Sequence, residues 1–233
     1  KFMRYHMEIY IKNQSPIYKL YYILIFFINL GLGMTNGILS ILSPQSLDIV
    51  FKKFKKLTIN RDLIVENRTG IFYVRKLTTD NQIISDYYED ELLPYFNKVE
   101  NGLFIDVGAN IGKWSIYMAK ALGDHGRVLS IEPFIENYSI LLKSILLNKC
   151  SNTIPLQIAL SDTECEGAMI VEDSSNLGMV HLDKLGPEEH NVQVRLLDNV
   201  LSDLQIDISE ISLLKIDVEG HELNVLYGCR GLL

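Results

Sequence analysis

Cysteine is scarce in this sequence, with three residues among 233. Cys150, Cys165 and Cys229 lie far apart, form no CxxC pair and have no histidines near them at the spacing of zinc ligands. An odd number of isolated cysteines excludes the disulfide framework that holds many small secreted domains together. We therefore expect reduced thiols, a cytoplasmic location and no bound metal.

The sequence also lacks an excess of basic residues. It has 22 lysines and arginines against 29 aspartates and glutamates, which gives a net charge of −7. A chain of this charge repels phosphate backbones, so we do not expect nucleic acid as a partner. Hydrophobic residues make up 48% of the chain, enough to bury the core of one domain with an appendage.

Charge is absent from one long stretch near the start of the chain, residues 20–47, which is 28 residues long. A helix that crosses a bilayer needs about 20 apolar residues, and Gly33 with Gly37 forms the small-xxx-small pair that lets membrane helices pack closely. The same pattern is typical of a hydrophobic helix packed on another domain. We expect residues 1–56 to form a hydrophobic helical segment, and membrane association through residues 20–47 stays open.

Residues 57–100 have the pattern of a β-hairpin followed by a short helix. Two β-rich runs, Leu63–Glu66 and Ile71–Val74, flank the turn sequence NRTG. Those first three turn residues also match a glycosylation sequon, but no secretory feature supports that interpretation. The helix is expected over residues 86–97.

From residue 101 to residue 233, strands and helices alternate. Buried strands are predicted in GLFIDVGA, GRVLSIEP, TIPLQIAL and ISLLKIDVEG, whereas residues 161–207 look looser and more polar. In the helix after Pro133, six residues at helical spacing are expected to face the core: Phe134, Tyr138, Leu141, Leu142, Ile145 and Leu146. The predicted fold class is α/β, with a parallel sheet covered by helices on both faces.

Glycines and polar residues follow each predicted strand. In strand order they are Asp106, Gly108, Asn110 and Gly112, then Glu132, then Ser161 and Asp162, and finally Asp217 and Glu219. Parallel strands bring their carboxyl ends to one edge of the sheet, where ligands of such sheets bind. We therefore expect one site there, although Gly108 and Gly112 also suit tight packing of a helix on a strand, and Asp162 suits the start of a loop.

The turn after the first of these strands lacks the G-x-G-x-x-G pattern of dinucleotide-binding proteins. Its pattern is D-x-G-x-N-x-G, from Asp106 to Gly112. A carboxylate before the turn repels a pyrophosphate but attracts the amino group of a methionine. Glu132, 20 residues after Gly112, is placed to accept hydrogen bonds from both hydroxyls of a ribose. The sequence thus indicates S-adenosyl-L-methionine as the cofactor.

Four stretches, FIDVGANIGKWSIYMAK, VLSIEP, IALSD and LLKIDVEGHELNVLYG, resemble the FkbM family of S-adenosylmethionine-dependent methyltransferases. The resemblance implies a Rossmann-like class I methyltransferase domain, which we assign to residues 101–233, and O-methylation of a small hydroxylated metabolite or sugar. It also implies the cofactor contacts. These are Asp106, Gly108, Ala109, Asn110 and Gly112 at the methionine end, Glu132 at the ribose, and Ser161 with Asp162 near the adenine.

The sequence departs from this family's pattern at its end. The sheet of the superfamily continues with further strands after the helix that follows DVEGHE, whereas this chain stops at Leu233. We expect a sheet truncated after the fourth strand and its helix, with one edge covered by a missing C-terminal segment or by a second copy of the chain. The cofactor half is then present and the acceptor half incomplete.

Methyl transfer to a hydroxyl is helped by a general base near the acceptor. The candidates are Asp217, Glu219 and His221, which follow the last strand, and the sequence does not choose among them. Two other functions remain as alternatives. One is a NAD-dependent oxidoreductase, whose glycine pattern is missing, and the other is a truncated, non-catalytic protein that binds a cofactor or is tethered to a membrane.

Overall fold

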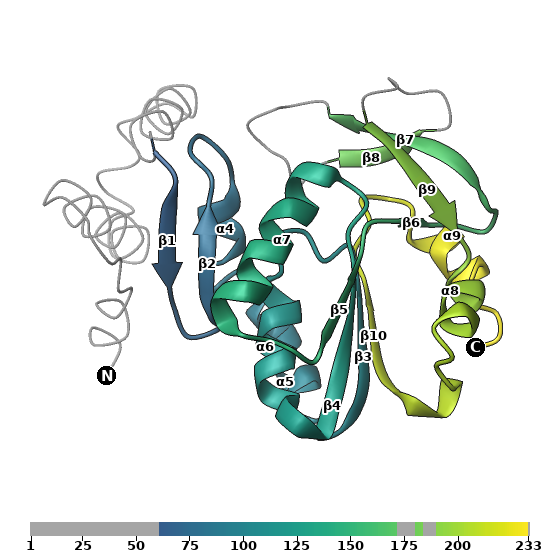
Figure 1. Cartoon of the computed structure of the whole chain (residues 1–233), viewed down its shortest axis with the longest axis horizontal. Helices are drawn as coiled ribbons and strands as arrows, with labels where there is room; N and C mark the ends of the chain where they lie inside the picture. Colours follow the sequence, from purple (N-terminus) through teal and green to yellow (C-terminus); the bar gives the residue numbers. More distant parts are fainter. Residues whose placement is uncertain (1–60, 172–179, 184–189, 233) are drawn as a thin grey trace, which may run out of the picture. The chain divides into compact units, whose positions relative to one another are not determined.

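The structure is a computed structural model that describes residues 61–171, 180–183 and 190–232 (Figure 1). Its contacts divide the chain into two compact units: of the described residues, 61–67 and 73–77 belong to one unit, and the rest to the other. The uncharged stretch of residues 20–47 lies outside the described residues. Within the described part, no helix is long and apolar enough to cross a membrane. The boundaries 1–56, 57–100 and 101–233 therefore stay predictions.

The two β-rich runs form the predicted strands. β1 (Leu63–Glu66) and β2 (Ile71–Val74) make a two-stranded sheet, and buried and exposed residues alternate along β1. This alternation is expected of a strand with one buried face.

The segment after the hairpin contains short helices instead of the single helix predicted over residues 86–97. They are α4 (Asp80–Ile83), η2 (Asp90–Leu92) and α5 (Leu93–Phe96). Glu89 has a left-handed backbone with φ of +54°, which ends any helix before residue 90. Pro94 then stands in the first turn of α5, where its missing N–H is tolerated, so a new helix begins there.

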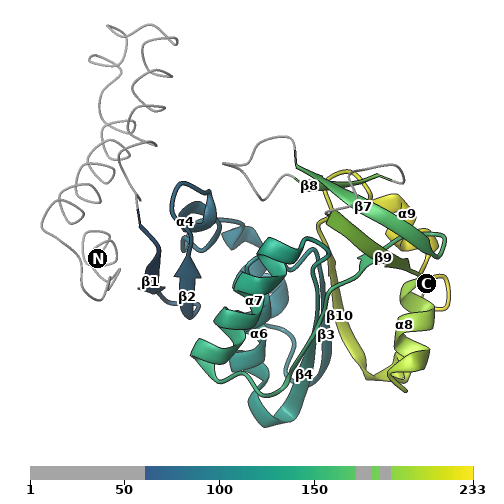
Figure 2. The same cartoon turned by 45° about the horizontal axis from the view of Figure 1, so that its top comes forward.

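The central sheet is parallel, as predicted, with the order β10-β3-β4-β5. Its strands are β3 (Gly102–Val107), β4 (Gly126–Ile131), β5 (Thr153–Leu156) and β10 (Ile211–Ile216). Figures 1 and 2 show α6 and α7 on one face and α8 on the other, with α9 following β10. The helices are α6 (Lys113–Leu122), α7 (Ile135–Asn148), α8 (Leu197–Asp203) and α9 (Glu222–Tyr227). The predicted α/β class is confirmed.

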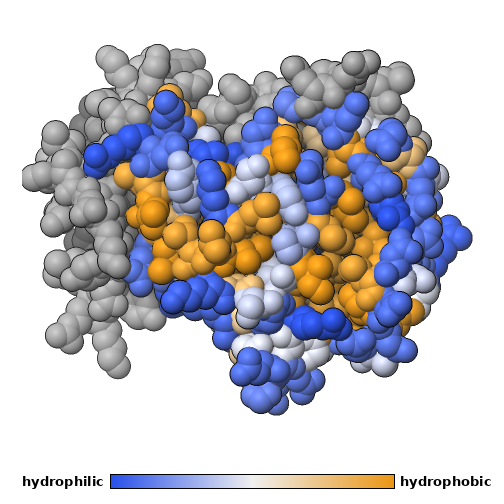
Figure 3. Space-filling view, in the orientation of Figure 1, coloured by the Kyte–Doolittle hydropathy of each residue, from blue (hydrophilic) through white to orange (hydrophobic). Residues whose placement is uncertain are grey.

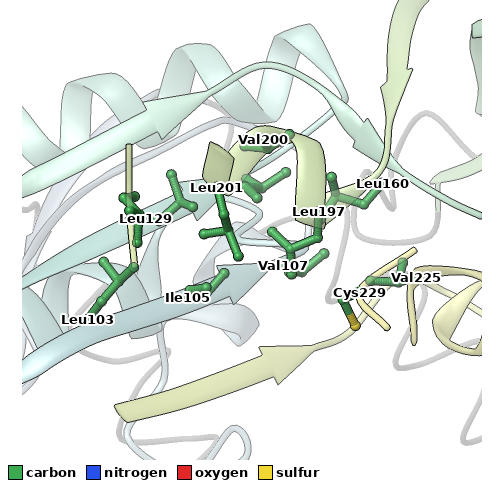
Figure 4. Close-up of a cluster of buried hydrophobic side chains, with 12 residues drawn as sticks. Leu103, Ile105, Val107, Leu129, Leu160, Leu197, Val200, Leu201, Val225 and Cys229 are labelled. Atoms are coloured by element: carbon green, nitrogen blue, oxygen red, sulfur yellow. The ribbon is translucent and has the colours of Figure 1, made fainter. Parts of the chain in front are cut away.

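Apolar side chains of the sheet pack against α8. Figure 4 shows side chains of β3 and β4 directed toward that helix, and all of them are buried. The cluster includes Leu103, Ile105, Val107, Leu129, Leu197, Val200, Leu201 and Cys229. Burial on both faces explains why β3 reads as a continuous apolar run.

The three cysteines are free, as predicted, and Cys150 and Cys229 are buried.

The stretch TIPLQIAL, predicted as one strand, is divided between two sheets. β5 ends at Leu156, and β6 (Ala159–Leu160) pairs with Val194 and Arg195 of another strand. That strand belongs to a second sheet with the order β6-β9-β7-β8, made with β7 (Cys165–Val171), β8 (Val180–Asp183) and β9 (Asn191–Arg195).

The expectation of a loose stretch over residues 161–207 is therefore wrong. β9 has the burial pattern of a strand with one buried face, but it is only five residues long and its outward residues are polar. Short strands of this composition resemble loops when they are read from the sequence alone.

The buried face of α7 differs from the predicted one. Leu141 is fully buried, but Leu142 is 40% exposed and Leu146 is 78% exposed, and hydrophobic surface is visible over α7 in Figure 3. The cause lies in Gly112, because a Cβ there would stand 2.7 Å from Leu141 Cδ1 and 3.8 Å from Ser144 Cβ. The small residues Gly112 and Ser144 let α7 approach closely, so a narrow face is buried instead of the most apolar one.

This assignment of the α7 face can be tested with two matched substitutions. Leu141→Ala removes a side chain that is 0% exposed and is expected to lower the free energy of unfolding by about 2–5 kcal/mol. Leu146→Ala, on the same helix, is expected to change it by less than about 0.5 kcal/mol. Urea denaturation measures both. Equal losses for the two variants would show that the helix face is wrongly assigned.

Candidate functional site

Backbone hydrogen bonds join the carboxyl ends of three neighbouring strands. After β3, Gly108 N and Ala109 N both donate to Ile131 O at the end of β4, each over 3.0 Å. On the other side, Asp217 N donates to Val107 O over 3.0 Å. The turn after β3 is thereby held against the ends of both neighbours, and the strand ends meet at one rim.

Gly108 makes this close approach possible. Its φ is +75°, and a Cβ at this position would lie 1.8 Å from the carbonyl oxygen of Asp217. The missing side chain therefore leaves room for the end of β10, a structural role that Gly108 has in addition to its place in the lining of the cavity described below. Gly112, with φ of +94°, makes room for Leu141 of α7 instead.

A cavity opens at the rim. Its apolar lining residues include Ile131, Ile158, Leu160, Met169 and Leu182. Its polar lining residues include Tyr88, Asn110, Glu132, Asp217, Glu219 and His221. Among the described residues, no group of three or more histidine, cysteine and acidic side chains is arranged to hold a metal ion.

The structure brings some of the predicted site residues to the cavity and leaves others outside it. Those that line it are Gly108, Asn110, Glu132, Asp217, Glu219 and His221. Those that are not among the lining residues are Asp106, Ala109, Gly112, Ser161 and Asp162.

Asp106 lies below the cavity in an interior network. It is 1% exposed, its Oδ2 accepts a hydrogen bond of 2.7 Å from Ser115, and its Oδ1 lies 3.2 Å from Lys215 Nζ. Lys215 also approaches Asp217 Oδ2 at 3.6 Å. Burial alone would lower the pKa of the Lys215 ammonium, but the charges of Asp106 and Asp217 outweigh that effect and raise the pKa. One buried cation therefore couples two of the predicted site carboxylates.

Glu132 holds the turn as well as lining the cavity. Its Oε2 accepts a hydrogen bond of 2.8 Å from Asn110 N, and its Oε1 accepts one of 3.1 Å from Phe134 N. The Asn137 side chain donates a third hydrogen bond, so one of the four lone pairs of the carboxylate is left for a ligand. Burial raises the pKa of this carboxyl to about 7, although hydrogen bonds from Asn110, Phe134 and Asn137 oppose the shift.

Ser161 orients the ring of His221. The Ser161 hydroxyl donates to Asp162 Oδ1 over 3.0 Å, and its oxygen lies 2.9 Å from His221 Nε2. A hydroxyl has one proton, and with that proton directed to Asp162 the hydrogen between Ser161 and His221 is carried by Nε2. The Nδ1 of a neutral His221 is then the ring nitrogen with a free lone pair.

Two residues of the site escape the reading of the sequence. Lys215 has a recognisable signal, because it is a single charge inside the apolar run ISLLKI. Tyr88 has none, because it lies in an irregular segment far from the strand ends. Two apolar lining residues, Met169 and Leu182, are also not predicted, because they belong to β7 and β8 in the stretch that looks loose in the sequence.

The raised pKa of Glu132 predicts how stability depends on pH. Between its usual value of 4.5 and the folded value of about 7, unfolding releases a proton. The free energy of unfolding is therefore expected to fall by roughly 3 kcal/mol as pH rises through this range. Glu132→Gln removes the titrating proton and should flatten that fall. Urea denaturation at several pH values checks this, and parallel profiles for the two proteins would contradict it.

Two known methyltransferases are similar to this chain in sequence. Methyltransferase sdnD of Sordaria araneosa is 26% identical over 201 residues, which is 74% of this chain and 77% of that protein. Methyltransferase 1 of Beauveria bassiana (strain ARSEF 2860) is 28% identical over 149 residues, or 55% and 59% of the two chains. Among solved structures, the Methyltransferase FkbM of Methylobacillus flagellatus KT is 20% identical with a TM-score of 0.40, covering 60% of this chain and 36% of that one.

The family itself follows from the match to its domain profile. The profile of the Methyltransferase FkbM domain matches residues 106–233, which is more than half of the 233 residues and includes every cavity residue named above except Tyr88. Together with the parallel α/β sheet, this match identifies a Rossmann-like methyltransferase. The chain belongs to the FkbM methyltransferase family.

Proposed function

We propose that the cavity binds S-adenosylmethionine and that the chain transfers its methyl group to a hydroxyl oxygen of a small metabolite or sugar. The observation that carries the proposal is the mixed lining of one cavity. Aliphatic side chains, the buried carboxylate of Glu132 and the acids Asp217 and Glu219 line it together, and these are the groups that adenine, ribose and a cationic methionine require.

The apolar lining residues suit a nucleobase. Ile131, Ile158 and Leu160 offer aliphatic surface to a flat ring, and Glu132, which follows Ile131, keeps a lone pair that fits a ribose hydroxyl. The cavity encloses about 70 Å³, below the roughly 300–1,000 Å³ of small-molecule pockets. Binding therefore requires side chains at its mouth to move.

The polar lining residues suit a cation. Asp217 and Glu219 are both acidic, and the buried Lys215 shares its charge between Asp106 and Asp217. Asn110 adds a buried Oδ1 that has no hydrogen-bond partner among the described residues. An ammonium group of a ligand can donate to that oxygen, and a sulfonium charge offsets part of the excess negative charge.

When bound, S-adenosylmethionine supplies an electrophilic methyl group on a sulfonium. A new bond forms from the acceptor oxygen to the methyl carbon, the carbon–sulfur bond breaks, and sulfur keeps the electron pair. The residues of this chain align the two molecules and remove the hydroxyl proton. No covalent intermediate with the protein is required.

His221 is our preferred general base. Its ring is held by Ser161, and the tautomer set by that hydrogen bond leaves Nδ1 free to accept a proton. Asp217 is less suitable because it shares the charge of Lys215 at 3.6 Å. Glu219 is the second candidate, because burial and the neighbouring charges of Asp217 and Glu222 raise its pKa.

The cofactor can be tested by titration calorimetry with S-adenosylhomocysteine. Wild-type protein is expected to bind it, and Glu132→Ala is expected to lose about 1.5–3 kcal/mol, a roughly ten- to hundredfold weaker affinity. Glu136→Ala is the matched control and should bind normally, because Glu136 is an exposed acid in the first turn of α7, four residues after Glu132. Tight binding of NAD without binding of S-adenosylhomocysteine would refute the proposal, as would an unchanged affinity for a folded Glu132→Ala.

The orientation of His221 can be tested by nitrogen-15 NMR of histidine-labelled protein, with His221→Gln to assign the signal. Above the pKa of the imidazole, the wild-type spectrum should show the tautomer protonated at Nε2. Ser161→Ala should give a mixture of tautomers, whereas Ser139→Ala, whose hydroxyl donates to Ile135 O on α7, should not. A wild-type ring protonated at Nδ1 would rule out His221 as the base in this orientation.

A further inference from the structure

One residue that lines the cavity lies outside the family domain. Among the described residues that line the cavity, Tyr88 alone lies outside residues 106–233, the range matched by the family profile. It belongs to the segment between the hairpin and β3, and it is 39% exposed. The other lining residues lie within the matched domain, and Tyr88 is the lining residue that the preceding segment adds.

The backbone around Tyr88 is pinned to the start of α6. Lys113 is 2% exposed, and its Nζ donates to Ser85 O over 2.9 Å and to Tyr88 O. Its ammonium also lies 4.1 Å from the ring centroid of Trp114, and Trp114 Nε1 donates to Glu89 Oε2 over 2.7 Å. Lys113 and Trp114 are the first two residues of the helix that follows the glycine turn, so the segment is fixed relative to that turn.

The pKa of the Lys113 ammonium reflects the burial of this anchor. Burial lowers the pKa of its ammonium to about 8, while the charges of Glu89 and Asp86 act in the opposite direction. An ammonium with so little exposure retains its proton only when carbonyl and carboxylate partners surround it. The anchor holds the backbone of the segment, and the Tyr88 ring lies 5.4 Å from the Lys113 ammonium with its hydroxyl hydrogen-bonded to Glu89.

Tyr88 lies near the acidic residues of the cavity, Asp217 and Glu219. The pKa of its hydroxyl is raised, first by burial and then by the charges of Glu89 and Asp217, with a smaller effect of Glu219. Asp217 is 48% exposed. Lys113 is buried and donates to backbone carbonyls, and Lys215 is buried and shared by Asp106 and Asp217. An incoming molecule therefore meets an aromatic ring and a net negative charge, because one lysine is shared by two carboxylates.

We propose that Tyr88, Asp217 and Glu219 form the acceptor subsite and that it takes a hydroxyl-bearing ring that is uncharged or cationic. The inference rests on the proposed function and narrows its substrate class. The Tyr88 ring packs on the face of the acceptor, and the carboxylates accept hydrogen bonds from its hydroxyls. Anionic acceptors are rejected, because like charges at close range in a partly desolvated site repel strongly.

The test measures binding to protein saturated with S-adenosylhomocysteine, by saturation-transfer NMR and calorimetry. One probe series is dopamine, catechol and 3,4-dihydroxybenzoate, which share a ring and two hydroxyls but are cationic, neutral and anionic. The second is methyl glucoside and glucuronate. In at least one series, the neutral or cationic probe should bind at least about ten times more tightly than the anion.

Variants assign that selectivity to the named residues. Tyr88→Ala should weaken binding of the preferred probe about tenfold, while the affinity for S-adenosylhomocysteine stays within about threefold. Tyr87→Ala, an adjacent tyrosine that is 55% exposed and is not among the cavity residues, is the matched control and should change neither. The double variant Asp217→Asn with Glu219→Gln should admit the anionic probes.

Three results would overturn the subsite: anions that bind as well as neutral probes, a Tyr88→Ala protein with unchanged probe binding, or no binding of any neutral or cationic probe. Failure of the proposed function is a different outcome, because S-adenosylhomocysteine itself would then not bind.

Discussion

The close approach of the turn after β3 to both neighbouring strands is the constraint on which the site depends. A single carbonyl, Ile131 O, accepts from Gly108 N and Ala109 N, and on the opposite side the Asp217 carbonyl occupies the space that a side chain at position 108 would fill. Glu132 then locks the turn by accepting from Asn110 N. The cavity exists because these contacts draw three strand ends together, so the same groups build the fold and shape the site.

The sequence predicts the parts of this molecule whose signals are local. Apolar runs locate the strands of the central sheet, and parallel pairing places Glu132 and Asp217 on one rim, as the structure shows. The buried face of α7 is not predicted, because packing next to Gly112 selects a narrow face with Asn137 and Ser144 instead of the most apolar one. The division of TIPLQIAL also escapes prediction, since only the pairing partner decides where a strand leaves a sheet.

Within the site, the sequence identifies which residues are polar but not which way they face. Asp106 fits the motif expected of a ligand contact, yet its carboxylate is buried between Ser115 and Lys215. Ser161 likewise supports His221 and does not line the cavity. Neither side chain lines the cavity, and each contacts a residue at or next to it. Such roles depend on partners that come from distant parts of the chain, so they become visible only in the folded protein.

Trp114 is the single tryptophan of the chain, and it lies where the segment bearing Tyr88 is attached. Its indole is hydrogen-bonded to Glu89 and covered by the Lys113 ammonium. A charged group over the ring and a carboxylate on its N–H both shift indole emission. The protein therefore carries one tryptophan where the segment bearing Tyr88 is attached, and the emission of this indole reports on that attachment without any added label.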